Sequence, residues 1–269
     1  MGNAVSAASA EASALLKVEQ QGKVLTVGLN RPAKRNALND GIILAIGDCF
    51  AHLPENIGAV VIHGIGDHFS SGLDLSELTE HDATEGLLHS QMWHRVFDRI
   101  QYSRVPVIAA LKGAVIGGGL ELACAAHIRV AEPSAYFALP EGQRGIFVGG
   151  GGSVRLPRLI GVARMTDMML TGRVYSATEG SSYGFAQYLV EAGGALAKAL
   201  ELAERIASNA PLTNFAVLQA LPMIAEANPQ TGLLMESLMA TVAQSDKEAK
   251  RRIRQFLDHK TAKVKPGKS

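Results

Sequence analysis

Short apolar runs alternate with longer amphipathic stretches as far as about Val190, and beyond that point the apolar runs stop. The clearest runs lie at Val24–Leu29, Ala59–Ile62 and Val105–Leu111, and they are typical of buried β-strands. Strands that alternate with helices favour a mixed α/β domain in which helices cover the sheet. We therefore predict an α/β fold class for this part of the chain.

Two stretches of the α/β part, roughly Asp40–Leu53 and Thr84–Ile100, carry apolar residues at helical spacing. From about residue 195 onward the pattern is helical throughout, with breaks at Asn209-Ala-Pro211 and Asn228-Pro229. This pattern predicts two parts, residues 1–194 and 195–269. The helical stretches of the second part are Ala195–Ala210, Leu212–Glu226, Gln230–Gln244 and Lys247–His259.

The composition favours a folded chain with a large core, because 47% of its 269 residues are apolar and 19% are charged. Only Cys49 and Cys124 are present, so disulfides are not the expected source of stability, and a reducing cytoplasm fits. Apolar runs are interrupted well before the ~20 residues of a membrane span. Met1–Leu16 lacks the pattern of a signal peptide, and we interpret it as an arm before the first strand.

Charge is uneven along the chain, although the formal net charge is only +1. Between Lys247 and Lys268 nine Lys or Arg residues stand against two acids. A solvated helix end explains such a basic tail, because cations suit the C-terminal end of the helix dipole. Contact with the phosphates of a small ligand is the second explanation, and nucleic acid is the third.

The most informative stretch joins a buried strand, the glycines Gly117–Gly119 and an apolar helix that contains Glu121. Three glycines let the backbone turn sharply and come close to a ligand. The start of the helix presents unpaired N–H groups and a positive dipole end, which together hold an anion or a developing oxyanion. Glu121 has leucines on both sides, so its carboxylate is paired, used in chemistry, or on a solvated face of the first turn.

A second carboxylate, Glu141, follows Pro140 at the end of a short apolar strand, and Gly149–Gly152 precede the next helix. By itself a Pro-Glu-Gly sequence is usually a turn. Beside Glu121 and two glycine-rich stretches of backbone, Glu141 becomes a candidate partner in an acid–base pair.

The loop Asp67–Leu75 contains Gly72, which permits a bend that points a backbone N–H inward. Two N–H donors from separate loops form an oxyanion hole for a carbonyl oxygen, and an ordinary Asx or serine turn is the alternative. No group of His, Asp and Glu has the spacing of a metal site, and neither a G-x-G-x-x-G turn after the first strand nor a Walker lysine is present. We therefore expect neither a metal nor a redox cofactor.

Taken together, these segments resemble the crotonase family, the enoyl-CoA hydratases and isomerases, from about Val18 to Lys263. The joint pattern is specific, although each glycine cluster alone is weak. The matching motifs are Asn30-Arg31-Pro32, Arg35-Asn36-Ala37-Leu38, Phe69-Ser-Ser-Gly72-Leu-Asp74-Leu75, Gly117-Gly-Gly119-Leu-Glu121, and Pro140-Glu141 with Gly149.

The resemblance implies a spiral of strand–strand–helix units in residues 1–194. It implies that residues 195–269 form a helical segment that packs subunits into homotrimers or homohexamers. The substrate would be an acyl-CoA thioester, so CoA enters with the substrate, and no cofactor, nucleic acid or membrane is expected. The resemblance assigns the N–H groups of Leu73 and Gly118 to the oxyanion hole, Glu121 and Glu141 to catalysis, Gly149 to the water and acyl pocket, and Ala37, Ser71, Asp74, Phe256 and Lys260 to CoA binding.

Within the family the chain is most similar to hydratases of methylthioacryloyl-CoA, through Trp93-His94, Tyr136–Phe147 and Leu170–Tyr175. Val148 and the pair Gln143-Arg144 depart from the broad family near the acyl end, which leaves acyl specificity open. The expected reaction is syn hydration of a short-chain 2-enoyl-CoA. The alternatives are hydrolysis of an acyl-CoA thioester on the same site and a CoA- or RNA-binding protein without catalysis.

Overall fold

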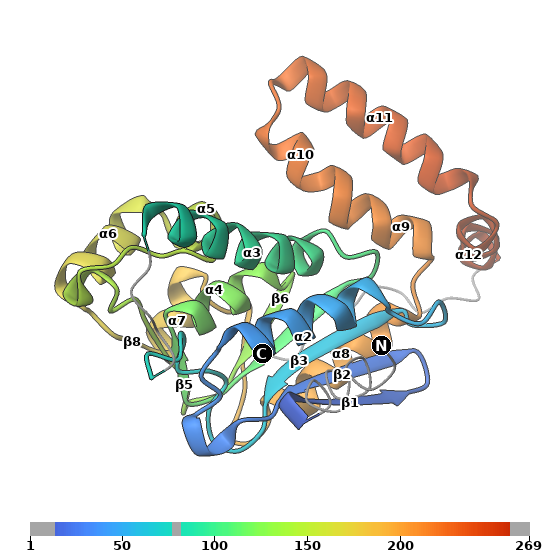
Figure 1. The fold of residues 1–269 in the computed structure, drawn as a ribbon. Coiled ribbons are helices and arrows are strands. Elements are labelled where there is room, and N and C mark those ends of the chain that lie inside the picture. Colours follow the sequence, from blue (N-terminus) through green and yellow to red (C-terminus); the bar gives the residue numbers. More distant parts are fainter. Residues whose placement is uncertain (1–13, 77–81, 259–269) are drawn as a thin grey trace, which may run out of the picture. The chain divides into compact units, whose positions relative to one another are not determined.

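The computed structural model describes residues 14–76 and 82–258, and its contacts divide the chain after Ala207 into two compact units. The first unit is built on a six-stranded sheet in the order β1-β2-β3-β4-β6-β9. Figure 1 shows β1, β2 and β3 side by side in this sheet. β1 pairs antiparallel with β2, and the later neighbours pair in parallel. The strands are β1 (Leu16–Gln21), β2 (Val24–Leu29), β3 (Ala59–Gly64), β4 (Val107–Leu111), β6 (Ile128–Ala131) and β9 (Tyr188–Leu189).

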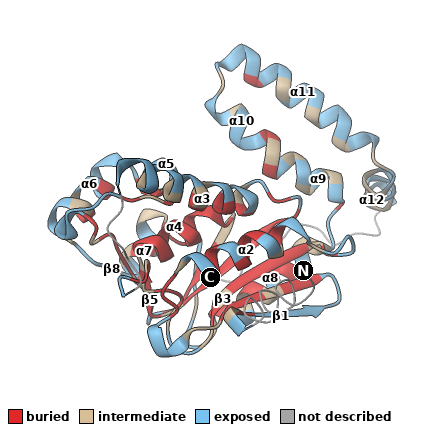
Figure 2. Cartoon of the chain, viewed as in Figure 1, coloured by how far each residue is buried: buried red, intermediate tan, exposed pale blue. Residues whose placement is uncertain are grey.

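The central strands β3 and β4 are apolar on both faces of the sheet, because their successive side chains point to opposite faces and almost all of them are buried. In β3, Val60 belongs to the larger apolar cluster, which includes three successive helices, and Val61 belongs to a smaller cluster that contains a single helix. Figure 2 shows the central strands as a buried layer. The three helices are α2 (Asp40–Ala51), α3 (Ala83–Gln101) and α4 (Gly118–Ala125), and the single helix is α8 (Ala195–Ala207).

A second sheet has three strands in the order β5-β7-β8. β4, β5 and α4 form one strand–strand–helix unit, with its first strand in the larger sheet and its second strand in the smaller one, and β6, β7 and α5 repeat this arrangement. The predicted α/β class is therefore confirmed. The remaining elements of this unit are β5 (Ala114–Ile116), β7 (Tyr136–Ala138), β8 (Tyr175–Ser176), α5 (Gly152–Ile160), α6 (Val162–Thr171), α7 (Ala177–Tyr183) and the 3-10 turns Pro32–Lys34 and Gly142–Arg144.

The edge strand β1 was not predicted from the sequence. Only its first residue, Leu16, is buried and the other five are exposed, so the strand lacks the apolar alternation that marks a half-buried strand. Backbone hydrogen bonds to β2 hold it in place. Most of the arm that we expected at Met1–Leu16 lies outside the described residues.

The described part of the second unit, which spans residues 208–269, consists of helices joined by short non-helical connections. It begins later than the predicted boundary at 194, because α8 packs on the sheet and belongs to the first unit. The single helix predicted over Leu212–Glu226 contains a π turn just before Pro222, whose missing N–H and bulky ring disfavour a regular α-helix there. Its helices are α9 (Pro211–Phe215), the π turn Ala216–Ala220, α10 (Leu221–Glu226), α11 (Pro229–Ser245) and α12 (Lys247–Leu257).

Candidate active site

The turn between β5 and α4 brings the backbone against a carboxylate. Gly117 precedes the helix with φ +52°, a conformation that glycine adopts readily. A Cβ at this position would lie 2.5 Å from Oε1 of Glu141, so only glycine leaves room for the acid. The next residue, Gly118, opens the helix, and its N–H has no acceptor within the helix.

A second backbone N–H approaches Gly118 from the loop after β3. Leu38 forms two backbone hydrogen bonds of 2.8 Å, to Gly72 and Asp74, which flank Leu73 and leave the N–H of Leu73 on the opposite side. A Cβ at Gly118 would lie 3.6 Å from the Leu73 nitrogen, so the two amides are neighbours. Within residues 14–76 and 82–258, neither N–H has a hydrogen-bond acceptor.

Leu73 and Gly118 both line a cavity of about 390 Å³. The cavity brings together six of the residues predicted for the site. These six are Ser71, Leu73, Gly118, Glu121, Glu141 and Gly149. One face of α3 also bounds the cavity and contributes Gly86, His89, Ser90 and Trp93. The loop before α5 contributes Arg144, Ile146, Phe147 and Val148.

Glu121 lies in the first turn of α4 with only 4% of its surface exposed. The backbone N–H groups of Gly150 and Gly152 both donate to its Oε1, with N···O distances of 2.9 and 2.7 Å. Burial raises the pKa of Glu121, while these two donors and the charge of Arg155 oppose that rise. One oxygen of this carboxyl group is therefore fixed by the backbone.

Glu141 is also buried, at 8% exposure, but its surroundings differ. Its Oε2 has no hydrogen-bond partner among the described residues. Burial raises the pKa of Glu141 to about 7, the charge of Glu121 adds to the rise, and Arg144 acts against it. A carboxyl group that is half protonated near neutral pH is suited to general acid–base chemistry.

Arg155 holds the glycine loop that binds Glu121. This buried side chain donates to the carbonyl oxygen of Gly150 at 2.9 Å, to Asp98 at 2.6 Å and to Gln101 at 2.6 Å. It thereby ties the loop to α3, since Asp98 and Gln101 lie near the end of that helix. The sequence analysis did not single out Arg155, because a lone arginine on a helix is usually solvated.

The residues predicted to bind CoA are distributed over both units. Ala37 is buried and its carbonyl oxygen accepts a hydrogen bond from Arg31, while Ser71 lines the cavity. Asp74 is buried but does not line the cavity. Phe256 lies in the second unit with 67% exposure, and Lys260 lies outside the described residues.

The wall formed by α3 was largely missed as part of the site. His89, Trp93 and Phe97 recur every four residues, and neighbouring rings contact each other along the helix in tilted and edge-on arrangements, with centroids 5.9 and 5.6 Å apart. A Cβ at Gly118 would lie 2.8 Å from the six-membered ring of Trp93, so this indole closes the cavity beside the Gly118 amide. The four-residue spacing is the signal in the sequence, but it indicates a buried helical face equally well.

No group of three or more His, Cys, Asp or Glu side chains in the described part of the chain could hold a metal ion. Across residues 14–76 and 82–258, every helix is too short or too polar to cross a bilayer.

Residues 19–266 match the family model of enoyl-CoA hydratase/isomerase. The chain is 34% identical to 2,3-dehydroadipyl-CoA hydratase of Escherichia coli K12, over 93% of this chain and 98% of the relative. It is also 34% identical to the short-chain-enoyl-CoA hydratase of Clostridium acetobutylicum, over 82% and 85% of the two chains.

Solved structures agree with this assignment. A protein from Rhodopseudomonas palustris CGA009, provisionally described as an enoyl-CoA hydratase, is 81% identical and covers 93% of this chain and 97% of its own, with a TM-score of 0.90. The enoyl-CoA hydratase of Bacillus anthracis is 30% identical over 91% and 96%, with a TM-score of 0.86. The chain belongs to the enoyl-CoA hydratase/isomerase family, which confirms the predicted crotonase membership.

Proposed function

We propose that the chain is a hydro-lyase that adds water across the double bond of a short-chain 2-enoyl-CoA. The observation that carries this proposal is the shared cavity. Two buried glutamates, Glu121 and Glu141, border the same space as Leu73 and Gly118, whose backbone N–H groups have no acceptor among the described residues. The names of the relatives support the same class of reaction.

In the proposed mechanism, the two amides bind the thioester oxygen and draw electrons from the alkene, which makes C3 electrophilic. Glu121 accepts a proton from water while the water oxygen bonds to C3. Glu141 delivers its proton to C2, so the elements of water are added and the two glutamates exchange protonation states. The pKa of Glu141, about 7, suits the proton donor, and the backbone-bound Glu121 suits the base.

For the acyl group we propose a small substrate such as methylthioacryloyl-CoA. The cavity has a volume of about 390 Å³, and the α3 wall and Phe147 contribute aromatic and apolar surface to its lining. The Trp93 ring is packed edge-on against Phe97, so the Trp93 side chain has little room to move and enlarge the cavity. The named relatives act on different acyl groups, a dehydroadipyl group and short chains, so the family alone does not select one.

CoA and the partner subunits complete the proposal. Ala37 and Ser71 would contact the adenine, while Phe256 and Lys260 would approach the CoA phosphates from a neighbouring subunit. We propose a homotrimer or homohexamer, because α11 exposes Leu233, Leu234 and Leu238 by 59 to 64% of their surface. CoA arrives as part of the substrate, and the mechanism uses no other cofactor.

A substrate panel tests the proposal. Crotonyl-, methylthioacryloyl- and an aromatic enoyl-CoA are each incubated with the enzyme, and loss of the conjugated enoyl absorbance reports hydration. A thiol reagent reports hydrolysis in parallel on saturated and unsaturated thioesters. We expect hydration without release of free CoA, fastest with the smallest acyl groups. Release of thiol would favour the hydrolase alternative, and no reaction with any thioester would contradict both.

A further inference from the structure

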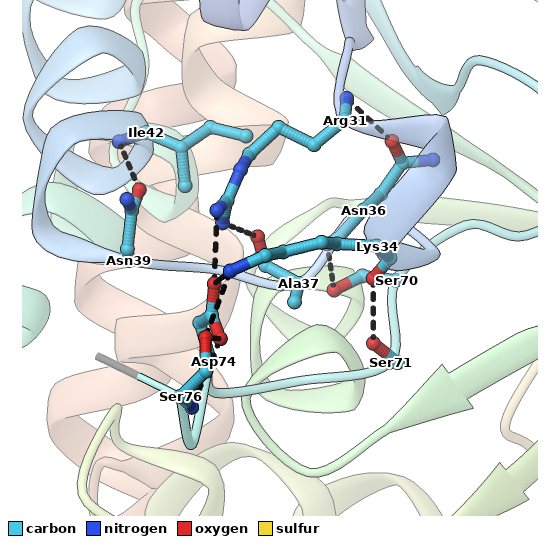
Figure 3. Close-up of polar contacts among 10 residues, drawn as sticks. All are labelled: Arg31, Lys34, Asn36, Ala37, Asn39, Ile42, Ser70, Ser71, Asp74 and Ser76. Atoms are coloured by element: carbon cyan, nitrogen blue, oxygen red, sulfur yellow. Dashed lines mark hydrogen bonds and ion pairs between the residues drawn. The ribbon is translucent and has the colours of Figure 1, made fainter. Parts of the chain in front are cut away.

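The carboxylate of Asp74 is a buried charge beside the cavity. Its side chain is 5% exposed, and it pairs with Arg31 at 2.9 Å and Lys34 at 3.0 Å (Figure 3). The backbone N–H and the hydroxyl of Ser76 donate to its other oxygen. Burial alone raises the pKa of Asp74, but these donors outweigh burial and hold that pKa far below its usual range. Asp74 is therefore an anion at neutral pH.

Arg31, one of the ion-pair partners of Asp74, also contacts the backbone segment Ala37-Leu38, which faces Leu73. Arg31 donates from Nη1 to the carbonyl oxygen of Ala37 at 2.8 Å and from Nη2 to Asp74 at 2.9 Å. Ala37 precedes Leu38, whose two backbone hydrogen bonds flank Leu73. One guanidinium thus fastens together the same two segments that those backbone bonds join (Figure 3).

A second connection lies on the other side of Leu73. The hydroxyl of Ser70 donates to the carbonyl oxygen of Asn36 at 2.8 Å, and the Asn36 amide donates to the carbonyl oxygens of Ile65 and His68. That connection is neutral and entirely local to the loops. The contact between Arg31 and Asp74 is instead an ion pair, and Asp74 directly follows Leu73, which borders the cavity.

We propose that Asp74 is a positioning residue of the oxyanion hole, whose ion pair with Arg31 fixes the backbone so that the N–H of Leu73 points at the thioester oxygen. This inference rests on the proposed hydratase function, and it gives Asp74 a role other than direct contact with CoA. A small displacement of an oxyanion donor matters, because the donor stabilises charge only at the place where that charge develops.

Asp74→Asn is the principal test, because asparagine has nearly the same size but lacks the charge. We expect kcat for crotonyl-CoA hydration to fall by roughly 10- to 100-fold. We expect KM, and the Kd of free CoA measured by calorimetry, to stay within about threefold of wild type, because neither depends on charge that develops at the acyl oxygen. The stoichiometry of CoA binding gives the folded fraction, to which kcat is normalised.

Asp67→Asn is the matched control, since Asp67 is an exposed aspartate of the same loop and should leave kcat unchanged. Arg31→Lys keeps the positive charge but loses the fork that reaches both Ala37 and Asp74. It should lower kcat in the same way if Asp74→Asn proves too unstable to purify. The double variant Arg31→Lys with Asp74→Asn should have a kcat no lower than that of the slower single variant, because both changes break the same ion pair.

The outcomes separate this inference from the proposed function. A wild-type enzyme without hydratase activity contradicts the function itself. With an active wild type, an Asp74→Asn variant whose kcat stays within about twofold of wild type overturns the positioning role. A variant that weakens CoA binding by about tenfold overturns it as well, whatever its kcat, and indicates direct contact with CoA.

Discussion

Glu121 and Glu141 border one cavity, but the protein treats their carboxyl groups in opposite ways. Glu121 receives two backbone N–H groups on one oxygen, from the loop that Arg155 ties to α3. Glu141 has an oxygen with no partner among the described residues, and its pKa is raised to about 7. Both side chains are buried, at 4% and 8% exposure, and burial raises the pKa of both, so burial does not explain the difference.

In the proposed mechanism, this difference in hydrogen-bond donors assigns the roles of the two acids. Charge-assisted bonds from backbone amides favour the ionised form of a carboxyl group, whereas burial without donors favours the neutral form. A pair of acids with one proton between them needs such an asymmetry, because two equivalent acids would share the proton without direction. The mechanism therefore depends on keeping the two environments distinct.

Removing either acid should have the largest effect. Glu121→Gln and Glu141→Gln should each lower kcat for hydration by about 10²- to 10⁴-fold, the usual contribution of a general acid or base. Steady-state kinetics with crotonyl-CoA measures this loss. The Kd of free CoA, measured by calorimetry, should change little, which shows that the cavity is intact. Wild-type turnover in either variant would mean that its glutamate has been given the wrong role.

The pH dependence of stability should report the raised pKa of Glu141 next. The folded pKa of Glu141, about 7, exceeds its value of 4.5 in the unfolded chain, so folding becomes less favourable as pH rises between these values. Glu141→Gln should escape this loss and gain about 3 kcal/mol of unfolding free energy, relative to wild type, between pH 4.5 and pH 8. Urea denaturation at both pH values measures the gain. The exposed Glu191→Gln is the control, and an equal gain there would refute the explanation.

The pH dependence of catalysis should follow the same group. Because the mechanism needs one proton on the pair, kcat/KM should fall tenfold per pH unit above about pH 7, where Glu141 loses its proton. Rates from pH 6 to 9 at constant ionic strength measure this decline. In Glu141→Gln the residual rate should lack it. A wild-type profile that stays flat to pH 9 would contradict the assignment of the proton donor.

Much of the fold was predictable because the central strands carry a strong local signal. The strand expected at Val24–Leu29 has those bounds in the structure, and the strand expected at Ala59–Ile62 extends two residues further. β1 escaped prediction because an exposed edge strand has no apolar pattern. The division into two sheets also escaped, since it depends on which strands pair and not on where they lie along the chain.

The candidate site was predictable where glycine and acid meet in a short motif, as at Gly118 and Glu121. The residues missed from it act through tertiary contacts. Arg155 matters because the fold brings it to the carbonyl oxygen of Gly150. Arg144 stood out in the sequence only as a departure from the family, and its place on the cavity beside Glu141 comes from the structure.

Arg144 allows the finest test of the contrast between the two acids. It is exposed, and its charge lowers the pKa of Glu141 only in part, so Arg144→Gln should move the alkaline decline of kcat/KM to higher pH by a few tenths of a unit. Arg144→Lys keeps the charge and should leave the decline where it is. In 1 M salt the shift should shrink, because ions screen an exposed charge. A shift to lower pH would show that Arg144 acts on the pair through something other than its charge.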